Sequence, residues 1–253
     1  MGANGIIENS ADFLRMALLT TEDVTRCLGV LSKLERHLEG SVILTGGIAT
    51  AWHLLCCGRA CQQRSLNDVD VVVEDMRDLP PSLSADFLIN HFHPTRGRGR
   101  ILIQLVDEEY RIRIDVFTPT TPTLMRRLKT AVGKTSCRFV SAEDISAKLL
   151  SVIYAVTRGE LVEPKYVEHF RLLFSVVDLV KTREVWREYR REDQAVELDE
   201  AVEAVERSIA ANPNLLQAGS YSQDLNRTCH WCCDSEKFPI APALKVCEIL
   251  GHV

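Results

Sequence analysis

The sequence lacks the features that mark several specialised classes of protein. It contains no internal repeat and no low-complexity segment, which excludes a repeat architecture. Positive charge is not in excess: 30 Lys and Arg stand against 35 Asp and Glu, so a net charge of −5 excludes a general binder of polyanions. The nine cysteines are an odd number and do not form the framework of a small secreted protein. A reduced cytoplasm is therefore the expected compartment.

No membrane span is expected either, although one segment suggests it. Residues 40–58 contain no Asp, Glu, Lys or Arg, but they include Gly46-Gly47, three hydroxyl side chains and His53. This pattern is more typical of a buried strand, a turn and a helix than of a transmembrane segment. The first residues do not resemble a signal peptide, so we expect a cytoplasmic protein that does not engage membranes.

The pattern of apolar residues predicts an α+β fold class, with a β-sheet and helices first and an all-α helical domain second. We place the first domain at residues 1–125 and the helical domain at residues 126–253. Helices are expected at approximately residues 21–40, 48–55, 85–91, 141–156, 164–180, 182–191 and 198–209. The expected strands are residues 41–45 and 67–73, followed by a hairpin of 101–106 and 110–117.

The segment Asp68-Val69-Asp70 places two acids inside an apolar run. On a strand these side chains point to the same face, roughly 6–7 Å apart. Converging carboxylates repel each other and are costly to bury unless a cation lies between them. Divalent Mg²⁺ prefers such ligands together with substrate phosphates. The alternative is that one acid caps a turn and the other forms a surface salt bridge.

Two other segments point to the same chemistry. Gly46-Gly47 stands between a predicted strand and a predicted helix, where the free N–H groups of a helix N-terminus suit a phosphate. Asp115 lies on a later strand-like run and would complete a carboxylate site from a neighbouring strand. Three carboxylates can hold two ions roughly 3.5–4 Å apart. Arg111 and Arg113 alternate with Asp115, and they could either neutralise it or bind phosphates of a substrate.

This order of segments resembles the nucleotidyltransferase superfamily related to DNA polymerase β. Within it, Arg64 before Asp68-Val69-Asp70, and Lys148 in the following helical domain, resemble the AbiEii-type abortive-infection nucleotidyltransferases. The resemblance covers roughly residues 40–180 and implies a nucleotidyltransferase-like mixed β-sheet flanked by helices. One departure is the twenty residues between Gly47 and Asp68, a longer spacing than usual, which we assign to a loop at residues 56–63.

The resemblance implies a role for each of these residues. Gly46 and Gly47 would cradle the triphosphate of a nucleotide, with Arg64 and Lys148 also on the nucleotide side. Asp68, Asp70 and Asp115 would be the catalytic residues and would bind two Mg²⁺ ions. A nucleotide would then move from a nucleoside triphosphate to a hydroxyl of an RNA or protein acceptor. For Lys148 the alternative is an exposed helix lysine paired with Asp144.

Other functions remain open at the level of sequence. The same fold could be a non-catalytic module that binds nucleotide or RNA, and the resemblance also implies a toxin restrained by an antitoxin-like partner. The basic loop at residues 93–100 could contact RNA, or its charges could serve only to keep an exposed loop in solvent. The cluster at residues 229–233 contains one Cys-x-x-Cys pair, to which Cys247 or His252 could add zinc ligands, but no second pair is present.

Overall fold

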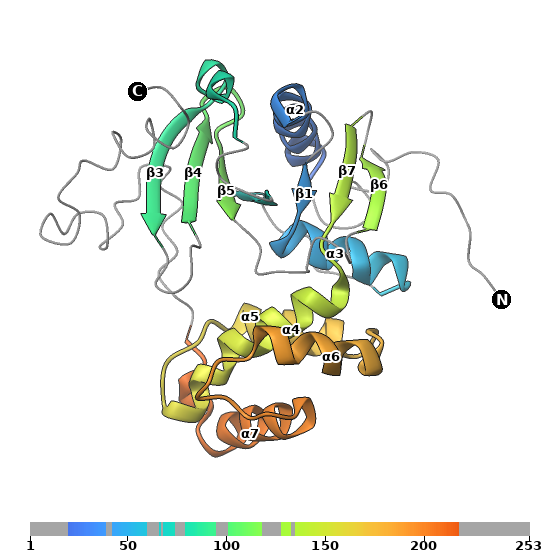
Figure 1. Ribbon diagram of the computed structural model, residues 1–253, viewed down its shortest axis with the longest axis vertical. Coiled ribbons are helices and arrows are strands. Elements are labelled where there is room, and N and C mark those ends of the chain that lie inside the picture. Colours follow the sequence, from blue (N-terminus) through green and yellow to red (C-terminus); the bar gives the residue numbers. More distant parts are fainter. Residues whose placement is uncertain are drawn as a thin grey trace, which may run out of the picture.

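The structure, a computed structural model, describes residues 20–38, 42–59, 66, 68–73, 79–94, 101–117, 128–132 and 135–217. Figure 1 shows a sheet with helices α2 and α3 beside it, and a layer of helices below. The helices are α2 (Thr21–Leu38), α3 (Gly46–Cys56), α4 (Ala142–Ile153), α5 (Pro164–Phe174), α6 (Leu179–Tyr189) and α7 (Leu198–Ala211). Short 3₁₀ helices are η2 (Pro81–Ala85), η4 (Tyr154–Arg158) and η5 (Pro213–Leu215).

One seven-stranded mixed sheet organises the first part of the chain. Its strands are β1 (Ile43–Leu44), β2 (Asp68–Val72), β3 (Leu88–Pro94), β4 (Ile101–Asp107), β5 (Ile112–Phe117), β6 (Leu128–Val132) and β7 (Thr135–Phe139). They lie in the order β3-β4-β5-β2-β1-β7-β6. The pairs β2–β5 and β1–β7 are parallel and the other pairs are antiparallel. The sheet is therefore mixed, as predicted, and its central strands β5, β2 and β1 come from three separate parts of the sequence.

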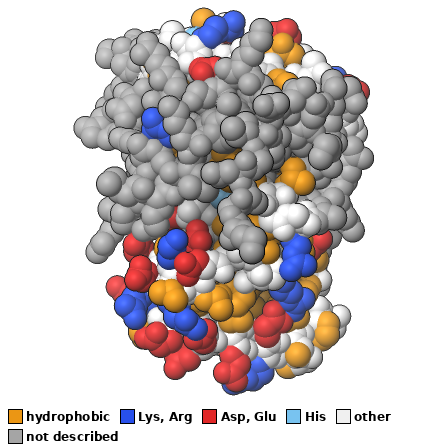
Figure 2. All heavy atoms as spheres, turned by 90° about the vertical axis from the view of Figure 1, so that its right-hand side faces the viewer, with side chains coloured by type: hydrophobic (Ala, Val, Ile, Leu, Met, Phe, Trp, Pro, Cys, Tyr) orange, Lys and Arg blue, Asp and Glu red, His pale blue; other side chains and the backbone are white. Residues whose placement is uncertain are grey.

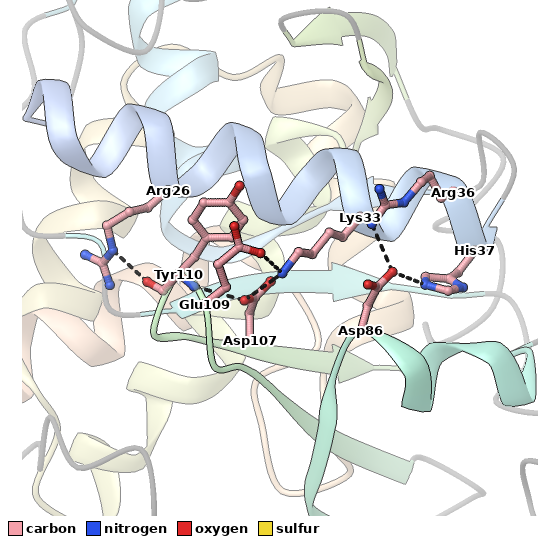
Figure 3. Close-up of polar contacts among 8 residues, drawn as sticks. All are labelled: Arg26, Lys33, Arg36, His37, Asp86, Asp107, Glu109 and Tyr110. Atoms are coloured by element: carbon pink, nitrogen blue, oxygen red, sulfur yellow. Dashed lines mark hydrogen bonds and ion pairs between the residues drawn. The ribbon is translucent and has the colours of Figure 1, made fainter.

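Helix α2 packs on the sheet through an apolar face and is held there by polar contacts. Its Val24, Cys27, Leu31 and Leu34 are buried in the same apolar core as β1, β2 and β5. Figure 3 shows that basic side chains of α2 reach acids and carbonyl groups of the β4–β5 turn and of the segment before β3. Burial of the apolar face supplies most of the stability of such a helix, and the polar contacts fix its position.

The helices after β7 form a second apolar core that meets the first one at α4 and α5. Ile145 of α4 belongs to the core under the sheet, whereas Leu150 belongs to the helical core around Trp186. Ser141 caps α4, and its side-chain oxygen accepts a hydrogen bond of 3.1 Å from the Asp144 N–H. Helix α4 therefore links the sheet to the remaining helices.

The helical layer carries charged groups of both signs on its surface. Figure 2 shows Lys, Arg, Asp and Glu side chains interspersed with apolar ones on the lower part of the molecule. Exposed pairs such as Arg171–Glu206 and Arg183–Asp199 connect helices there. In the view shown, these charges therefore belong to a solvated surface. Among the described residues, no helix combines the length and the apolar composition needed to cross a bilayer.

Two local predictions differ from the structure. The helix predicted at residues 85–91 is wrong, because this segment enters strand β3, which pairs with β4. Hydrogen bonds to a neighbouring strand outweigh a weak local preference. The strands β6 and β7 were not predicted, and they extend the sheet to residue 139, beyond the boundary placed at 125/126. The division into two domains stays a prediction, and the sheet continues past the predicted domain boundary.

Candidate active site

Two neighbouring strands bring Asp68, Asp70, Arg113 and Asp115 together. Strands β2 and β5 pair in parallel, with Asp68 opposite Arg113 and Asp70 opposite Asp115. Residues two apart on a strand point to the same face, so these four side chains share one face of the sheet. The prediction that Asp115 lies on the strand beside Asp68 and Asp70 is confirmed. The register of a single strand pair therefore determines the geometry of the acidic site.

The glycine pair begins helix α3 directly beside Asp70. The N–H of Thr45 donates a 3.0 Å hydrogen bond to the backbone oxygen of Asp70, which ties the start of the helix to β2. Gly46 has a φ of +63°, and a Cβ there would lie 1.7 Å from Oδ2 of Asp70. A Cβ on Gly47 would meet no described atom within 4 Å. The position of the pair between a strand and a helix is confirmed, and the positive end of α3 adjoins the acids.

The carboxylates on this face lie in surroundings that disfavour negative charge. Burial, together with the charges of Asp68 and Asp115, raises the pKa of Asp70 to about 7. Burial also raises the pKa of Asp115 to about 6, even though Arg113 opposes the rise. Burial is the largest cause of both shifts, and carboxylates shifted this far are concentrated at functional sites.

Arg113 occupies the face between two of the acids. Its Nη2 donates a 2.7 Å hydrogen bond to Oδ2 of Asp68, and its Nε lies 3.1 Å from Oδ1 of Asp115. Of the two alternatives left by the sequence, neutralisation of the acids by Arg113 is therefore what the structure contains. Arg111 does not share this face, because it lies in the turn before β5 with a φ of +52°.

Lys148 reaches toward the site from the helical layer. It is exposed on α4, and its Nζ lies 4.8 Å from the ring centroid of Phe117, the last residue of β5. Its positive charge lowers the pKa of Asp70, against the larger effect of burial. Lys148 is therefore near enough to Asp70 to act on it through charge, and its predicted role on the nucleotide side stays a prediction.

Gln104 is a site residue that the sequence did not reveal. It lies on β4 directly opposite Asp115 in the antiparallel register with β5, and it donates a hydrogen bond to the Asp115 carboxylate. The signal in the sequence was one amide in the apolar run Ile101–Val106. This signal becomes meaningful only when the register of β4 against β5 is known.

Several sequence predictions fall on residues that the structure does not describe. Arg64, the basic loop at residues 95–100, the cysteines at 229–233, Cys247 and His252 all lie outside the described residues. The proposed loop at 56–63 begins with the last residue of α3, and its end is also outside them. Cys56 and Cys57 are free and exposed.

His53 is a packing residue. It is buried on α3, and its Nε2 lies 2.8 Å from the backbone oxygen of Val140. Burial lowers the pKa of His53, which favours the neutral ring that donates to this oxygen. The contact joins α3 to the chain between β7 and α4.

The acidic side chains on this face are of the type that binds divalent cations, but they are not placed to share one ion. In the described ranges, no three His, Cys, Asp or Glu side chains are placed to share a metal ion. Oδ1 of Asp115 is buried and accepts no hydrogen bond from any described residue. Carboxylate oxygens are the ligands Mg²⁺ prefers, and a buried carboxylate oxygen without a donor is suited to a cation. The donor set therefore fits Mg²⁺, provided that Arg113 moves.

The known structures that resemble this chain include nucleotidyltransferases. A nucleotidyltransferase-like antigenic protein from Paracoccidioides brasiliensis is 16% identical, with 88% of this chain and 100% of that chain covered and a TM-score of 0.44. The antibiotic-resistance factor ANT(2'')-Ia is 14% identical, with 73% and 98% covered and a TM-score of 0.43. A cytoplasmic RNA terminal U-transferase is 13% identical, with 58% and 46% covered and a TM-score of 0.30.

None of these three structures is described as an AbiEii-type protein, and that finer resemblance is not confirmed. No protein-family model and no curated protein sequence matches this chain. At these TM-scores the likeness supports no conclusion by itself, so the functional interpretation depends on the residues of the site.

Proposed function

We propose that this protein is a Mg²⁺-dependent nucleotidyltransferase, which moves a nucleotide from a nucleoside triphosphate to a hydroxyl group of an RNA or protein acceptor. One observation carries the proposal: Asp68, Asp70 and Asp115 share one face of β2 and β5, beside the glycine start of α3. Three acids are costly on one partly buried face unless cations join them. A helix N-terminus beside them adds a place for phosphate.

The phosphate groups would lie between α3 and α4. The first N–H groups of α3 point away from the helix and carry its positive partial charge. Gly47 leaves the backbone open to a ligand, since a Cβ there meets no described atom within 4 Å. Lys148 adds a cation from α4 near Asp70. Together these groups would hold the triphosphate so that the α-phosphate faces the acids.

Asp68, Asp70 and Asp115 would be the residues that hold Mg²⁺, and two ions are expected. When bound, Mg²⁺ offsets the charge of the carboxylates and the triphosphate and lowers the pKa of the acceptor hydroxyl. The acceptor hydroxyl would lose its proton to solvent as its oxygen forms a bond to the α-phosphorus, while the bond from the α-phosphorus to the bridging oxygen breaks and pyrophosphate leaves. The raised pKa values of Asp70 and Asp115 predict that, without metal, this set of ligands is fully ionised only above neutral pH.

The test is transfer of label from nucleoside triphosphates to RNA or protein acceptors in the presence of Mg²⁺. We expect transfer by the wild type and a loss of about a hundredfold or more in the double variant Asp68→Ala, Asp70→Ala, because the carboxylates act in the transition state. The matched control is Asp193→Ala, Asp199→Ala, which removes two exposed acids of the helical layer and should retain activity.

The same assay can contradict the proposal. Absence of transfer by the wild type, or undiminished transfer by the Asp68→Ala, Asp70→Ala variant, would contradict it. Loss of activity in the control variant would show that activity depends on the total number of acidic residues or on correct folding, and not on the acids of the site. Circular dichroism of every variant checks that the helices and the sheet are retained.

A second candidate function is a non-catalytic module that binds nucleotide or RNA. The observation that favours it is Arg113, whose guanidinium already neutralises Asp68 and Asp115. In that case nucleotide would bind with the same affinity in the presence of Mg²⁺ and of EDTA. Binding that requires Mg²⁺, measured by calorimetry, would favour the transferase instead.

A further inference from the structure

Arg113 is a positive group built into the acidic face of the sheet. Arg113 lies on β5 opposite Asp68 of β2, and Asp115 lies two residues after Arg113 on β5. One guanidinium therefore lies within 4 Å of both carboxylates, at 2.7 Å from Asp68 and 3.1 Å from Asp115. The side chain of Arg113 is only 8% exposed, so it is held in the site and does not extend into solvent.

The two contacts of this guanidinium differ in quality. The contact with Asp68 is a hydrogen bond, which an arginine makes strongly with a carboxylate. The contact with Asp115 is close in distance, but Oδ1 of Asp115 accepts no hydrogen bond from any described residue. The contact between Arg113 and Asp115 is therefore mainly one of charge, with poor hydrogen-bond geometry at Oδ1, and this half of the bridge is the weaker one.

The position of Arg113 also affects how the acids could bind a metal ion. The three acids share a face, yet no three of the acidic, His or Cys side chains in the described part of the chain could share an ion as they stand. The guanidinium lies between Asp68 and Asp115, and a cation cannot bind both carboxylates while it remains there. Arginine keeps its charge throughout the physiological range, so it must move rather than lose a proton.

We propose that Arg113 is a displaceable counter-cation, which neutralises Asp68 and Asp115 until a divalent cation takes its place. The proposal rests on the metal-dependent function proposed above and adds its regulation. Because Arg113 and the cation compete for the same carboxylates, the free protein binds metal weakly. The phosphates of an incoming nucleotide add anionic groups that favour the metal and attract the released guanidinium. The site would thus be completed when nucleotide and metal arrive together.

The experiment measures metal binding without nucleotide or acceptor. Binding of Mn²⁺ is followed by the loss of its free electron paramagnetic resonance signal, and the rise in Tm is followed during titration with Mg²⁺. We expect Arg113→Gln to bind Mn²⁺ about tenfold more tightly than the wild type, because the metal no longer has to displace a cation. Its Tm should be lower than that of the wild type in EDTA and should rise more steeply with Mg²⁺.

Two other variants separate competition from a general loss of charge. Lys33→Gln removes a cation that likewise lies between two acids, Asp107 and Glu109, but outside the site. It should lose stability without tighter Mn²⁺ binding. Adding Asp115→Asn to Arg113→Gln should abolish the gain in affinity. Arg113→Lys keeps the charge but loses the planar fork, so it should tighten binding by less than Arg113→Gln.

The outcomes are decisive in either direction. Unchanged or weaker Mn²⁺ binding by Arg113→Gln would overturn the proposal and assign Arg113 a purely structural role. If that variant does not fold, unchanged or weaker binding by Arg113→Lys would do the same. A protein that shows this competition but transfers no nucleotide would refute the proposed activity and leave the role of Arg113 intact.

Discussion

At Gly46 two independent requirements for glycine coincide. The backbone has a φ of +63°, a conformation that costs other residues energy, and a Cβ would lie 1.7 Å from a carboxylate oxygen of Asp70. Gly159 has a similar φ of +77°, but a Cβ there meets no described atom within 4 Å. The comparison of these two glycines separates backbone strain from the close approach of Asp70.

We therefore expect Gly46→Ala to be much more harmful than Gly159→Ala. The Gly159 variant should lose about 1 kcal/mol of unfolding free energy from backbone strain alone. The Gly46 variant should lose about 3 kcal/mol or more, because Asp70 must also move. Urea unfolding followed by tryptophan fluorescence measures both values. Equal losses in the two variants would show that the contact with Asp70 is not important for stability.

Among the elements, α2 depends on a few buried polar contacts for its position. Lys33 lies 2.9 Å from Asp107, which is fully buried, and 2.8 Å from Glu109, and its Nζ also lies over the ring of Tyr110 (Figure 3). Burial opposes the charge on Lys33, but hydrogen bonds to Glu109 and Asp107 outweigh it and raise the pKa of Lys33. This cluster attaches the middle of α2 to the turn that joins β4 and β5.

Replacement of Lys33 by Gln should destabilise the protein by about 3 kcal/mol, because it leaves the buried Asp107 carboxylate without its cation. Arg36→Gln is the matched control on the same helix, since Arg36 is 61% exposed in its pair with Asp86. An exposed pair of this kind contributes at most about 1 kcal/mol. Chemical denaturation of both variants tests the difference, and similar small losses in both would contradict it.

At the scale of the whole molecule, the site lies where the sheet and the helical layer meet. Its acids come from β2 and β5, the glycine turn opens α3, and Lys148 comes from α4, which belongs to both apolar cores. The pKa of Asp70 reflects burial and the charges of Asp68, Asp115, Lys148 and Arg113. The charge state of the site is therefore a property of the assembled fold.

Without metal, the stability of the protein should fall as pH rises from about 4 to about 7. Asp70 and Asp115 have pKa values of about 7 and about 6 in the folded protein, above the ordinary value of 3.8. The folded state then binds more protons than the unfolded state in this window, so raising the pH favours unfolding. Each group contributes at most about 1.4 kcal/mol per pH unit. Denaturation in EDTA at several pH values measures the slope.

Two variants test the origin of this slope. Asp70→Asn should flatten it, because the residue can no longer lose a proton. Lys148→Met should extend the loss of stability to higher pH, because it removes a positive charge that lowers the pKa of Asp70. Lys165→Met, on the neighbouring helix α5, is the control. A slope that Asp70→Asn leaves unchanged would show that other groups determine it.

Local sequence patterns were sufficient for most of the helices and for the acidic strand. Apolar residues recur at helical spacing in α2, α4, α5, α6 and α7, and each of these helices is confirmed. Strands β3, β6 and β7 were missed, because a strand depends on its partner more than on its own residues. The same dependence hid Gln104, which is meaningful only opposite Asp115.

The sequence by itself determined the chemistry of Asp68-Val69-Asp70, since strand alternation places both carboxylates on one face wherever the strand lies. It also determined the glycine start of α3 and singled out Asp115. Only the tertiary structure decided that β2 and β5 pair in parallel, with Asp70 opposite Asp115, and that Arg113 lies between Asp68 and Asp115. The reason is physical: alternation is a property of one strand, whereas register, burial and the resulting pKa shifts depend on which strands become neighbours.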